Sequence, residues 1–346
     1  MKKHYKTVVV LLLLCAAVPF APVLRHMHDV SIRQAAVQAE AARVKYVSAK
    51  LRTVAIKSDL DGVVQKAYYY PTHSQHKKPL VVMLHTWRAT YRSLHAADGP
   101  IPPQQVFNLD WNYIQPDFRG SNDHPDACGS DKTVHDIDQA IDFAIKQGNV
   151  DTSRIYIVGA SGGGYEGLVY FMKSARPIAG YDIWVPVTDL VAFYFQGMSK
   201  LYKYDEDILK CTSSKGSELN FTEAARRSPM YMQTPVEKLK HGTFIHLYTG
   251  IHDGERNLIV PISHSIRMYN KILKDERVAD SRQYVSHKDM AYMLQNFASP
   301  YKMSIGKLQG GQNILYIKRT GSLSLTIFDG GHDIDFGQVF HDLNGG

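Results

Sequence analysis

The chain has 346 residues, a length that fits one large domain or two small ones. Its content of 44% hydrophobic and 21% charged residues is ordinary for a globular protein with a buried core. The formal charge of +7 is scattered rather than gathered into a stripe, and no segment repeats at a fixed period. We therefore expect neither a nucleic-acid-binding protein nor a solenoid.

The N-terminus has the charged-then-apolar order of a secretory signal, with MKKHYK followed by TVVVLLLLCAAV and the turn-prone PFAPVL. The apolar run from Val8 to Val18 is shorter than the about 20 residues that a membrane span needs. We therefore expect a cleaved signal peptide and an exported protein, either periplasmic or secreted. Two alternatives stay open. Residues 1–25 could remain as an anchor, or Cys15 could carry a lipid, although a lipobox normally has a small residue where this chain has Leu14.

Residues 26–50 are rich in alanine, glutamine and charge, and they predict a helical lead-in. Beyond them, strand-like and helix-like runs alternate, beginning with a hairpin that turns at Asp61-Gly62. Residues 189–236 interrupt the alternation and predict a mostly helical insertion, and residues 278–315 have no regular pattern. The later strands are expected at KPLVVML, WNYIQP, RIYIVGA, PIAGYDIWVPVT, TFIHLYTG and SLSLTIF, and the helices at TVHDIDQAIDFAIKQ, GYEGLVYFMKSA and SHSIRMYNKILKD. This order predicts a mostly parallel sheet with functional residues at the carboxyl ends of its strands.

The stretch GASGGG at residues 159–164 contains G-x-S-x-G, the pattern of a nucleophilic serine on a sharp turn between a strand and a helix. The strand RIYIV precedes it and the helix YEGLVYFMKSA follows it. Strand and helix nearly touch at such an elbow, and Gly159 and Gly163 supply the small residues that the crossing needs. These features favour Ser161 as a nucleophile over an ordinary serine in a glycine-rich turn.

The same stretch also contains G-x-G-x-x-G, the pattern of a dinucleotide-binding turn, over Gly162, Gly164 and Gly167. Asp182 lies near the distance expected for a ribose-binding acid. In that motif, however, the first glycine follows the strand directly and the acid ends the next strand. Here the first glycine follows a serine and the acid begins DIWVPV. We therefore expect no nucleotide cofactor, and the sequence has no clustered ligand spacing that indicates a metal.

A nucleophilic serine needs a base to take its proton and an acid to orient that base. Asp253 follows the strand FIHLYTG, and His332 follows the strand LSLTIF in a glycine-flexed turn. The order serine, acid, histidine, each after a later strand, is that of the α/β-hydrolases. Asp253 could instead be a simple turn former, and His332 a surface histidine. The competing candidates are Asp189 for the acid, and His252, His264 and His287 for the base.

The oxyanion of an acyl transfer needs two backbone N–H donors. We expect one donor from Gly162, the residue after the nucleophile. The other is expected from Thr86 or Trp87, in the loop that follows the strand VVMLH. The side chain of Trp87 either walls the acyl pocket or packs in the core.

The chain has three cysteines. If Cys15 leaves with the signal or carries a lipid, Cys128 and Cys211 remain. In an exported protein these two form either a disulfide or a pair of buried thiols.

Together these motifs resemble the α/β-hydrolase superfamily, in its prolyl-oligopeptidase/dienelactone-hydrolase branch. The matching pieces are VVMLHTW, PDFRGS, DIDQAIDFAIKQGNVDTSRIYIVGASGGG, TGIHDG with VPISHS, and FDGGHD. The resemblance implies an α/β fold with a mostly parallel eight-stranded sheet, helices on both faces, and a catalytic domain over residues 51–346. It also implies a cap insertion at about residues 189–236, close to the turn after DFRG at the active-site mouth. That proximity favours a Cys128–Cys211 disulfide. The chain departs from the family by having LHTW in place of a His-Gly run.

These features predict an exported serine hydrolase that cleaves an acyl bond, with Ser161, His332 and Asp253 as its triad. We expect a carboxylesterase acting on a carbohydrate or small-molecule ester, because the insertion is rich in aromatic residues and the chain has no room for the propeller of true prolyl oligopeptidases. The alternatives are a prolyl-oligopeptidase-type peptidase acting on short peptides, in which acids such as Glu206 could grip a free amine, and a non-catalytic binding relative. A membrane is an expected partner only through an uncleaved or lipidated N-terminus.

Overall fold

The structure, a computed structural model, divides the chain into two units, Met1–Ala49 and Lys50–Gly346. It describes residues 38–39, 41–93, 102–197, 203–255, 259–301 and 305–345. In the first unit, residues 38–39 and 41–49 are helical. The expected signal peptide or anchor lies outside the described residues, and so does most of the expected lead-in. None of the described helices is both long and apolar enough to cross a membrane.

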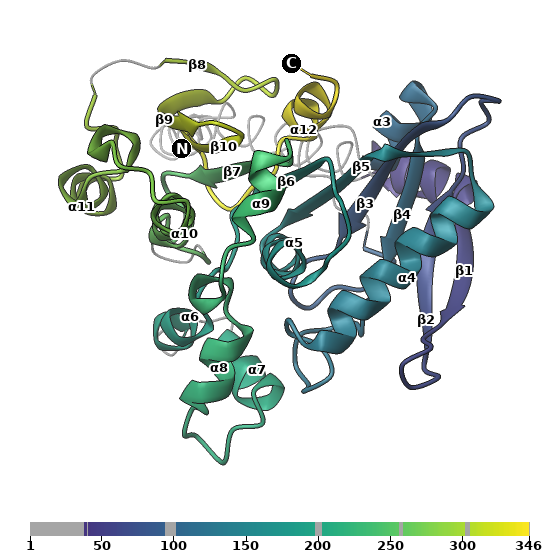
Figure 1. The fold of residues 1–346 in the computed structure, drawn as a ribbon, viewed down its shortest axis with the longest axis horizontal. Helices are drawn as coiled ribbons and strands as arrows, with labels where there is room; N and C mark the ends of the chain where they lie inside the picture. The colour runs from purple at the N-terminus through teal and green to yellow at the C-terminus, as the bar shows by residue number, and fades with distance from the viewer. Residues whose placement is uncertain are drawn as a thin grey trace, which may run out of the picture. The chain divides into compact units, whose positions relative to one another are not determined.

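A ten-stranded sheet forms the framework of the second unit, in the order β1-β2-β4-β3-β5-β6-β7-β10-β9-β8 (Figure 1). The six central strands, from β4 to β10 in that order, run parallel, and the two strands at each edge pair antiparallel. The strands in chain order are β1 (Arg52–Lys57), β2 (Val64–Tyr70), β3 (Lys78–Leu84), β4 (Asn112–Pro116), β5 (Val150–Ala160), β6 (Gly180–Trp184), β7 (Phe244–Gly250), β8 (Gly306–Lys307), β9 (Asn313–Thr320) and β10 (Leu323–Phe328).

The sheet has two strands more than the eight that we expected, and both lie at the edge beyond β10. All of β8, but only the first three of the eight residues of β9, fall within the segment 278–315 that we expected to be irregular. Strand β9 is only partly buried, and Lys318 and Arg319 interrupt its apolar pattern. Such a pattern is typical of a strand near the edge of a sheet, where charges resist edge-to-edge association, and only the two residues of β8 cover the outer side of β9.

Beyond Lys50 ten α-helices are described, and two short 3₁₀ turns accompany them, η1 (Pro229–Tyr231) and η2 (Ser281–Gln283). The helices are α3 (Pro102–Leu109), α4 (Asp131–Gln147), α5 (Gly162–Lys173), α6 (Leu190–Gly197), α7 (Tyr204–Cys211), α8 (Phe221–Arg227), α9 (Val236–Lys240), α10 (Ser263–Asp275), α11 (His287–Asn296) and α12 (Phe336–Leu343). Helix α4 begins where the Ser130 hydroxyl accepts the Thr133 N–H, and it ends at Gly148. The insertion at residues 189–236 contains α6, α7, α8 and η1, and these three helices lie together (Figure 1).

Helices cover both faces of the sheet (Figure 1). Gly167 of α5 lies against Ile183 of β6, whereas Asp342 of α12 has its carboxylate within 4.8 Å of Asp182, the preceding residue of that strand. Successive side chains of a strand point to opposite faces, so α5 and α12 lie on opposite sides of the sheet. Helix α5 is buried along nearly all of its length and leads away from the carboxyl end of the central strand β5. The turn between β5 and α5 is therefore held on a rigid core.

Candidate active site

Ser161 stands at the turn between β5 and α5, with φ at +56° and ψ at −118°. A positive φ is uncommon for a residue with a side chain and is characteristic of the strained elbow that presents a nucleophile. The Ser161 N–H donates to the Trp184 carbonyl at 2.9 Å, which ties the turn to β6. A Cβ on Gly159 would collide with the carbonyl of Gly163, and one on Gly163 would collide with that of Leu84. The elbow therefore requires glycine at both positions.

The glycines of the second motif have packing roles in α5. A Cβ on Gly164 would lie 3.0 Å from the Trp184 carbonyl oxygen, and one on Gly167 would lie 2.7 Å from Cδ1 of Ile183. Both glycines thus let α5 approach β6 closely. The pattern G-x-G-x-x-G follows from helix–sheet contact here, and no phosphate cradle is needed to explain it.

Asp253 and His332 meet at the ends of β7 and β10, which are parallel neighbours in the sheet. The two loops touch through Gly250, where a Cβ would collide with the carbonyls of the Gly330-Gly331 turn. His332 Nδ1 donates to Asp253 Oδ2 at 2.6 Å. The side chain of Asp253 is fully buried, which keeps this pair out of water.

The second oxygen of Asp253 accepts two backbone N–H groups, from Ile259 at 3.1 Å and from Val260 at 2.9 Å. Three donors therefore fix the orientation of this carboxylate. His332 Nε2 is buried and has no hydrogen-bond partner among the described residues. The ring of His332 is thus oriented by the hydrogen bond of Nδ1, and Nε2 is left to accept a proton.

A cleft of about 370 Å³ brings Ser161 and His332 together, and no hydrogen bond joins the two side chains within the described part of the chain. Catalytic hydrogen bonds are often unformed without substrate. The cleft is lined by Thr86, Trp87, Arg88, Ala89, Ser93, Ser161, Tyr204, Ile259 and His332.

Trp87 has its backbone against Gly162, where a Cβ would collide with the nitrogen and Cα of Trp87. The N–H of Trp87 therefore lies beside the residue expected to supply the first oxyanion donor. Thr86 presents its carbonyl carbon instead, 3.0 Å from that Cβ position. Of the two expected candidates, the geometry favours Trp87. Its side chain also lines the cleft and packs against Tyr165 and Phe193, so both expected roles of the ring coexist.

The competing acid and one competing histidine have structural partners away from the cleft. Asp189 caps the start of α6 and pairs with the Arg267 guanidinium at 3.3 Å. His264 is buried, where its Nδ1 accepts the Thr188 N–H at 3.1 Å and its Nε2 lies 2.9 Å from Gln196 Oε1. These contacts account for both residues without a catalytic role.

The other two histidines are closer to solvent. His252 pairs with Glu255 at 3.3 Å and with Asp329 at 3.4 Å. His287 is exposed in the first turn of α11. Neither of them lines the cleft that contains Ser161.

Glu206, the acid that we considered as a grip for a free amine, is half-exposed and pairs with Lys203 at 3.0 Å. The acid beside it in the sequence, Asp207, is the one that points inward. Asp207 is buried and accepts hydrogen bonds from Trp87 and Arg88 of the cleft wall. Nothing in the sequence distinguishes these two neighbouring acids, because their difference lies in which face of α7 is covered.

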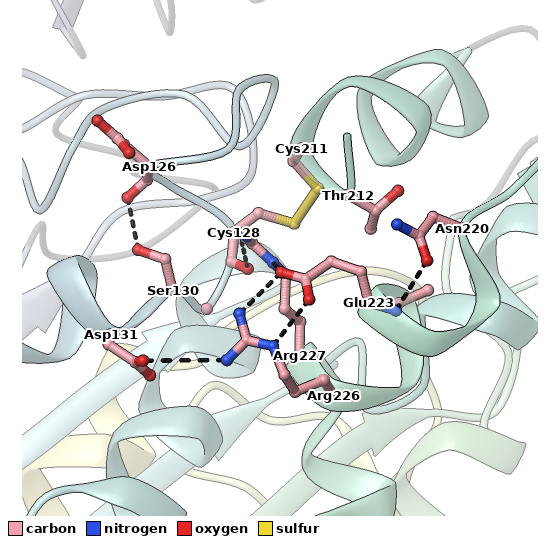
Figure 2. A network of polar contacts seen from close by, with 12 residues as sticks. Asp126, Cys128, Ser130, Asp131, Cys211, Thr212, Asn220, Glu223, Arg226 and Arg227 are labelled. Carbon is pink, nitrogen blue, oxygen red and sulfur yellow. Dashed lines mark hydrogen bonds and ion pairs between the residues drawn. A yellow bond between two sulfur atoms is a disulfide. The ribbon is translucent and has the colours of Figure 1, made fainter. Parts of the chain in front are cut away.

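The structure joins Cys128 and Cys211 in a disulfide with a Cα–Cα distance of 6.0 Å (Figure 2). It links the segment that follows β4 to the last residue of α7. Arg227 of α8 reinforces the junction, because its guanidinium donates to the carbonyls of Ala127 at 2.7 Å and Cys128 at 3.3 Å. The neighbouring Arg226 pairs with Glu223 at 2.7 Å and with Asp131 at 3.9 Å (Figure 2).

One cluster that the sequence did not indicate is formed by Asp182, His246 and Asp342, from β6, β7 and α12. Within the described residues, this is the group whose ligand atoms could reach a single metal ion, since they all lie within 4.8 Å of one another. Burial raises the pKa of Asp182 to about 7. Burial opposes the charged form of His246, but the two carboxylates outweigh it and raise its pKa to about 9. Protons can therefore balance the charge of this cluster at neutral pH, and a cation is not required for that purpose.

A parallel sheet with a strained serine after β5, an acid after β7 and a histidine after β10 defines the chain as an α/β-hydrolase. The sequence profile of the prolyl oligopeptidase family matches residues 103–289, more than half of the chain. The chain therefore belongs to the prolyl oligopeptidase family of serine hydrolases. This membership and the described sheet confirm the expected fold class and superfamily.

Proteins that resemble this chain in sequence or in fold agree with the family assignment. Over 231 residues the chain is 25% identical to acylamino-acid-releasing enzyme 1 of Oryza sativa subsp. japonica, covering 62% of this chain and 27% of the rice protein. Acylaminoacyl peptidase of Pyrococcus horikoshii superposes with a TM-score of 0.51 at 16% identity, over 65% of this chain and 35% of that one. A puromycin-hydrolyzing peptidase of Mycobacterium tuberculosis superposes at 0.50 with 15% identity, over 85% and 37%. The chain thus spans little more than a third of these structures, and the two likenesses concern the fold.

Proposed function

We propose that this protein is a serine peptidase that cleaves an amide bond in short, N-acylated peptides or amino acid derivatives. The family match and the names of the relatives favour a peptidase over the carboxylesterase that we preferred from the sequence. The observation that carries the proposal is the Asp253–His332 pair: Nε2 of His332 has no hydrogen-bond partner among the described residues, and His332 lines the same cleft as a serine in a strained elbow.

In this proposal Ser161 Oγ attacks the scissile carbonyl while His332 Nε2 takes its proton. Asp253 holds the ring in the required tautomer and stabilises the imidazolium that forms. The N–H groups of Gly162 and Trp87 bind the developing oxyanion. His332 then gives the proton to the leaving amine, which departs, and a water molecule hydrolyses the acyl-enzyme by the reverse sequence of proton transfers.

The preference for a blocked N-terminus rests on the charge of the cleft. The described lining residues include one cation, Arg88, and no carboxylate; the carboxylate that pairs with Arg88, that of Asp207 at 2.6 Å, is not among them. On entering the cleft, a free α-ammonium group would lose its hydration and gain no carboxylate from these lining residues. An acyl carbonyl could instead accept a hydrogen bond from the Arg88 guanidinium. A volume of about 370 Å³ is near the lower end of the range for small-molecule sites, which supports a short substrate.

Active-site labelling tests the nucleophile. A fluorophosphonate should label the wild-type protein and the Ser93→Ala variant, whose serine lies in the same cleft, but not Ser161→Ala. Label retained in Ser161→Ala would refute the assignment. The substrate class is then tested by comparing N-acetyl-aminoacyl anilides, free aminoacyl anilides and short-chain nitrophenyl esters. Higher kcat/KM on free aminoacyl anilides would refute the acyl preference, and activity confined to the esters would restore the carboxylesterase.

We also propose that the protein is exported by its N-terminal signal, leaving it periplasmic or secreted. The order of basic, apolar and turn-prone residues supports this, and so does the disulfide, a bond that persists mainly in oxidising compartments. Cell fractionation with mass measurement of the mature chain tests it. A full-length protein in the cytosolic fraction would contradict export, and a full-length or lipidated protein in the membrane would favour an anchor.

A further inference from the structure

The loop after β3 carries the N–H of Trp87. The insertion binds this loop through the buried carboxylate of Asp207 and through the Lys203 carbonyl, which accepts an N–H of Arg88 at 3.0 Å. Oδ2 of Asp207 accepts the indole Nε1–H of Trp87 at 3.2 Å and the Nε–H of Arg88 at 2.6 Å. Asp207 lies on α7 and is 4% exposed. A single oxygen thus binds two consecutive loop residues, which are 120 and 119 positions distant in sequence.

The same loop is held from its other side by Asn122, in the turn after β4. The N–H of Asn122 donates to the Trp87 carbonyl at 2.9 Å. Its side-chain Oδ1 accepts the N–H of Cys128 at 2.7 Å. Asn122 is completely buried, so water does not compete for either bond.

The disulfide joins these two supports. Cys128 is the residue bound by Asn122, and Cys211 lies four residues after Asp207 on α7, which places both on one face of that helix. Hydrogen bonds and one covalent bond therefore close a ring through Cys128, Asn122, Trp87, Asp207 and Cys211. We call this ring the Trp87 clamp.

The clamp matters because residues 85–93, the described part of the loop that carries Trp87, contain no helix or strand. A donor that stabilises an oxyanion must be held to within about 0.5 Å of its productive position. Arg227 fixes the Cys128 end by binding two adjacent carbonyls. On the insertion side, Asp207 accepts the hydrogen bond from the Trp87 indole and one from Arg88, and the Lys203 carbonyl accepts a second from Arg88. Changes on α7 are thereby transmitted to the oxyanion site.

We propose that Asp207 is a positioning residue for the reaction, and that the Cys128–Cys211 disulfide holds it in place, so that reducing this bond lowers turnover. This inference rests on the proposed function, in which the Trp87 N–H binds the oxyanion. In the reduction, a dithiol such as dithiothreitol supplies two electrons and two protons. The disulfide becomes two thiols, and the dithiol becomes its cyclic disulfide.

The test compares Asp207→Ala with Glu206→Ala, a change at the neighbouring acid on the exposed side of α7. Alanine is chosen because an asparagine would keep one carbonyl oxygen, which can accept both hydrogen bonds that Oδ2 of Asp207 accepts. Removing one oxyanion donor lowers kcat by about 10²–10³, and a displaced donor retains part of its effect, so we expect Asp207→Ala to lower kcat by about 10–100-fold. The loss in kcat should exceed the change in KM, because Asp207 is not a lining residue of the cleft. Glu206→Ala should match the wild type.

Binding of a trifluoromethyl ketone separates positioning from a loss of folded protein. This transition-state analogue uses the oxyanion donors, so its Ki should rise in proportion to the loss of kcat/KM in Asp207→Ala. The double variant Cys128→Ser/Cys211→Ser, and wild-type protein treated with dithiothreitol, should change in the same direction. Adding Asp207→Ala to the double variant should lower kcat by a smaller factor than it does in the wild type, because both changes open one clamp.

The outcomes distinguish this inference from the proposed function. If Ser161→Ala keeps its label, the proposed function fails and the clamp has no reaction to serve. If Ser161→Ala is inactive but folded Asp207→Ala keeps kcat and Ki within twofold of the wild type, the clamp alone is refuted. Wild-type kcat in the cysteine double variant, with Asp207→Ala impaired, would refute the part assigned to the disulfide.

Discussion

Replacing Asp253 by asparagine tests the arrangement of the triad most directly. One oxygen of Asp253 accepts the Nδ1–H of His332 at 2.6 Å, and the other accepts the N–H groups of Ile259 and Val260 at 3.1 and 2.9 Å. An asparagine amide offers only one accepting oxygen. If its NH₂ faced the loop, two backbone donors would lose their acceptor, whereas facing His332 it would displace only one donor. We therefore expect the NH₂ to face His332.

That orientation forces Nδ1 of His332 to accept a hydrogen bond and places the proton on Nε2. The imidazole then cannot take the proton of Ser161, so kcat should fall by about 10⁴. This corresponds to about 5.4 kcal/mol of lost transition-state stabilisation, at about 1.36 kcal/mol for each tenfold change in rate. KM should stay near its wild-type value, because the side chain of Asp253 is 0% exposed and does not line the cleft.

Steady-state kinetics on an acylated anilide measure both constants, and circular dichroism checks that the variant is folded. Asp329→Asn is the matched control, since Asp329 lies three residues before His332 but its side chain is 48% exposed and pairs with His252. The control should retain wild-type kinetics. A folded Asp253→Asn variant with kcat within tenfold of the wild type would refute the tautomer argument and the assignment of the acid.

Further predictions concern the oxyanion site and two buried titratable groups. Gly162→Ala places a methyl group against the Trp87 backbone and should lower kcat by about 10²–10³ with a small effect on KM, as measured by the same assay. The pKa of His246 is raised from 6.5 to about 9, so its stabilising contribution is complete below pH 6.5 and is lost as the pH rises through 9, by at most about 3 kcal/mol. Thermal unfolding from pH 6.5 to 9.5 should show this loss in the wild type and a flatter profile in His246→Gln; equal slopes would contradict it. Burial raises the pKa of Glu166 to about 7, so holding this carboxylate charged is costly above that pH, and Glu166→Gln should raise the denaturation midpoint at pH 8 but not at pH 4.

The residues proposed for catalysis could be found from the sequence because each follows a recognisable strand. Ser161 has a local glycine pattern, and Asp253 and His332 each follow an apolar run that ends in a glycine-rich turn. The choice between Thr86 and Trp87 could not be made, since it depends on which backbone nitrogen the loop turns toward Gly162. Sequence pattern thus locates the end of a strand, but the orientation of loop groups depends on contacts with distant segments.

Similar physical reasons explain why some features were not predicted from the sequence. Strand β9 is half-exposed and carries charges, so its apolar alternation is weak. Helix α12 is short, although Asp335 and Gln338 form a cap that could have indicated its start. The sequence does not distinguish Asp207 from the neighbouring Glu206, because the importance of Asp207 comes from partners more than a hundred residues earlier.

The adjacency of β7 and β10 has a consequence for engineering. Asp253 and His332 are separated by 79 residues of sequence, yet the two strands that carry them are direct neighbours. The chain between them leaves the sheet through α10 and α11 and returns along the edge strands β8 and β9. Residues Gly310 and Gly311, in the exposed turn between β8 and β9, are therefore suited to receive an inserted tag or reporter domain. Such a fusion would be attached at an outer edge of the sheet. The hydrogen bonds between β7 and β10 would still fix the spacing between Asp253 and His332.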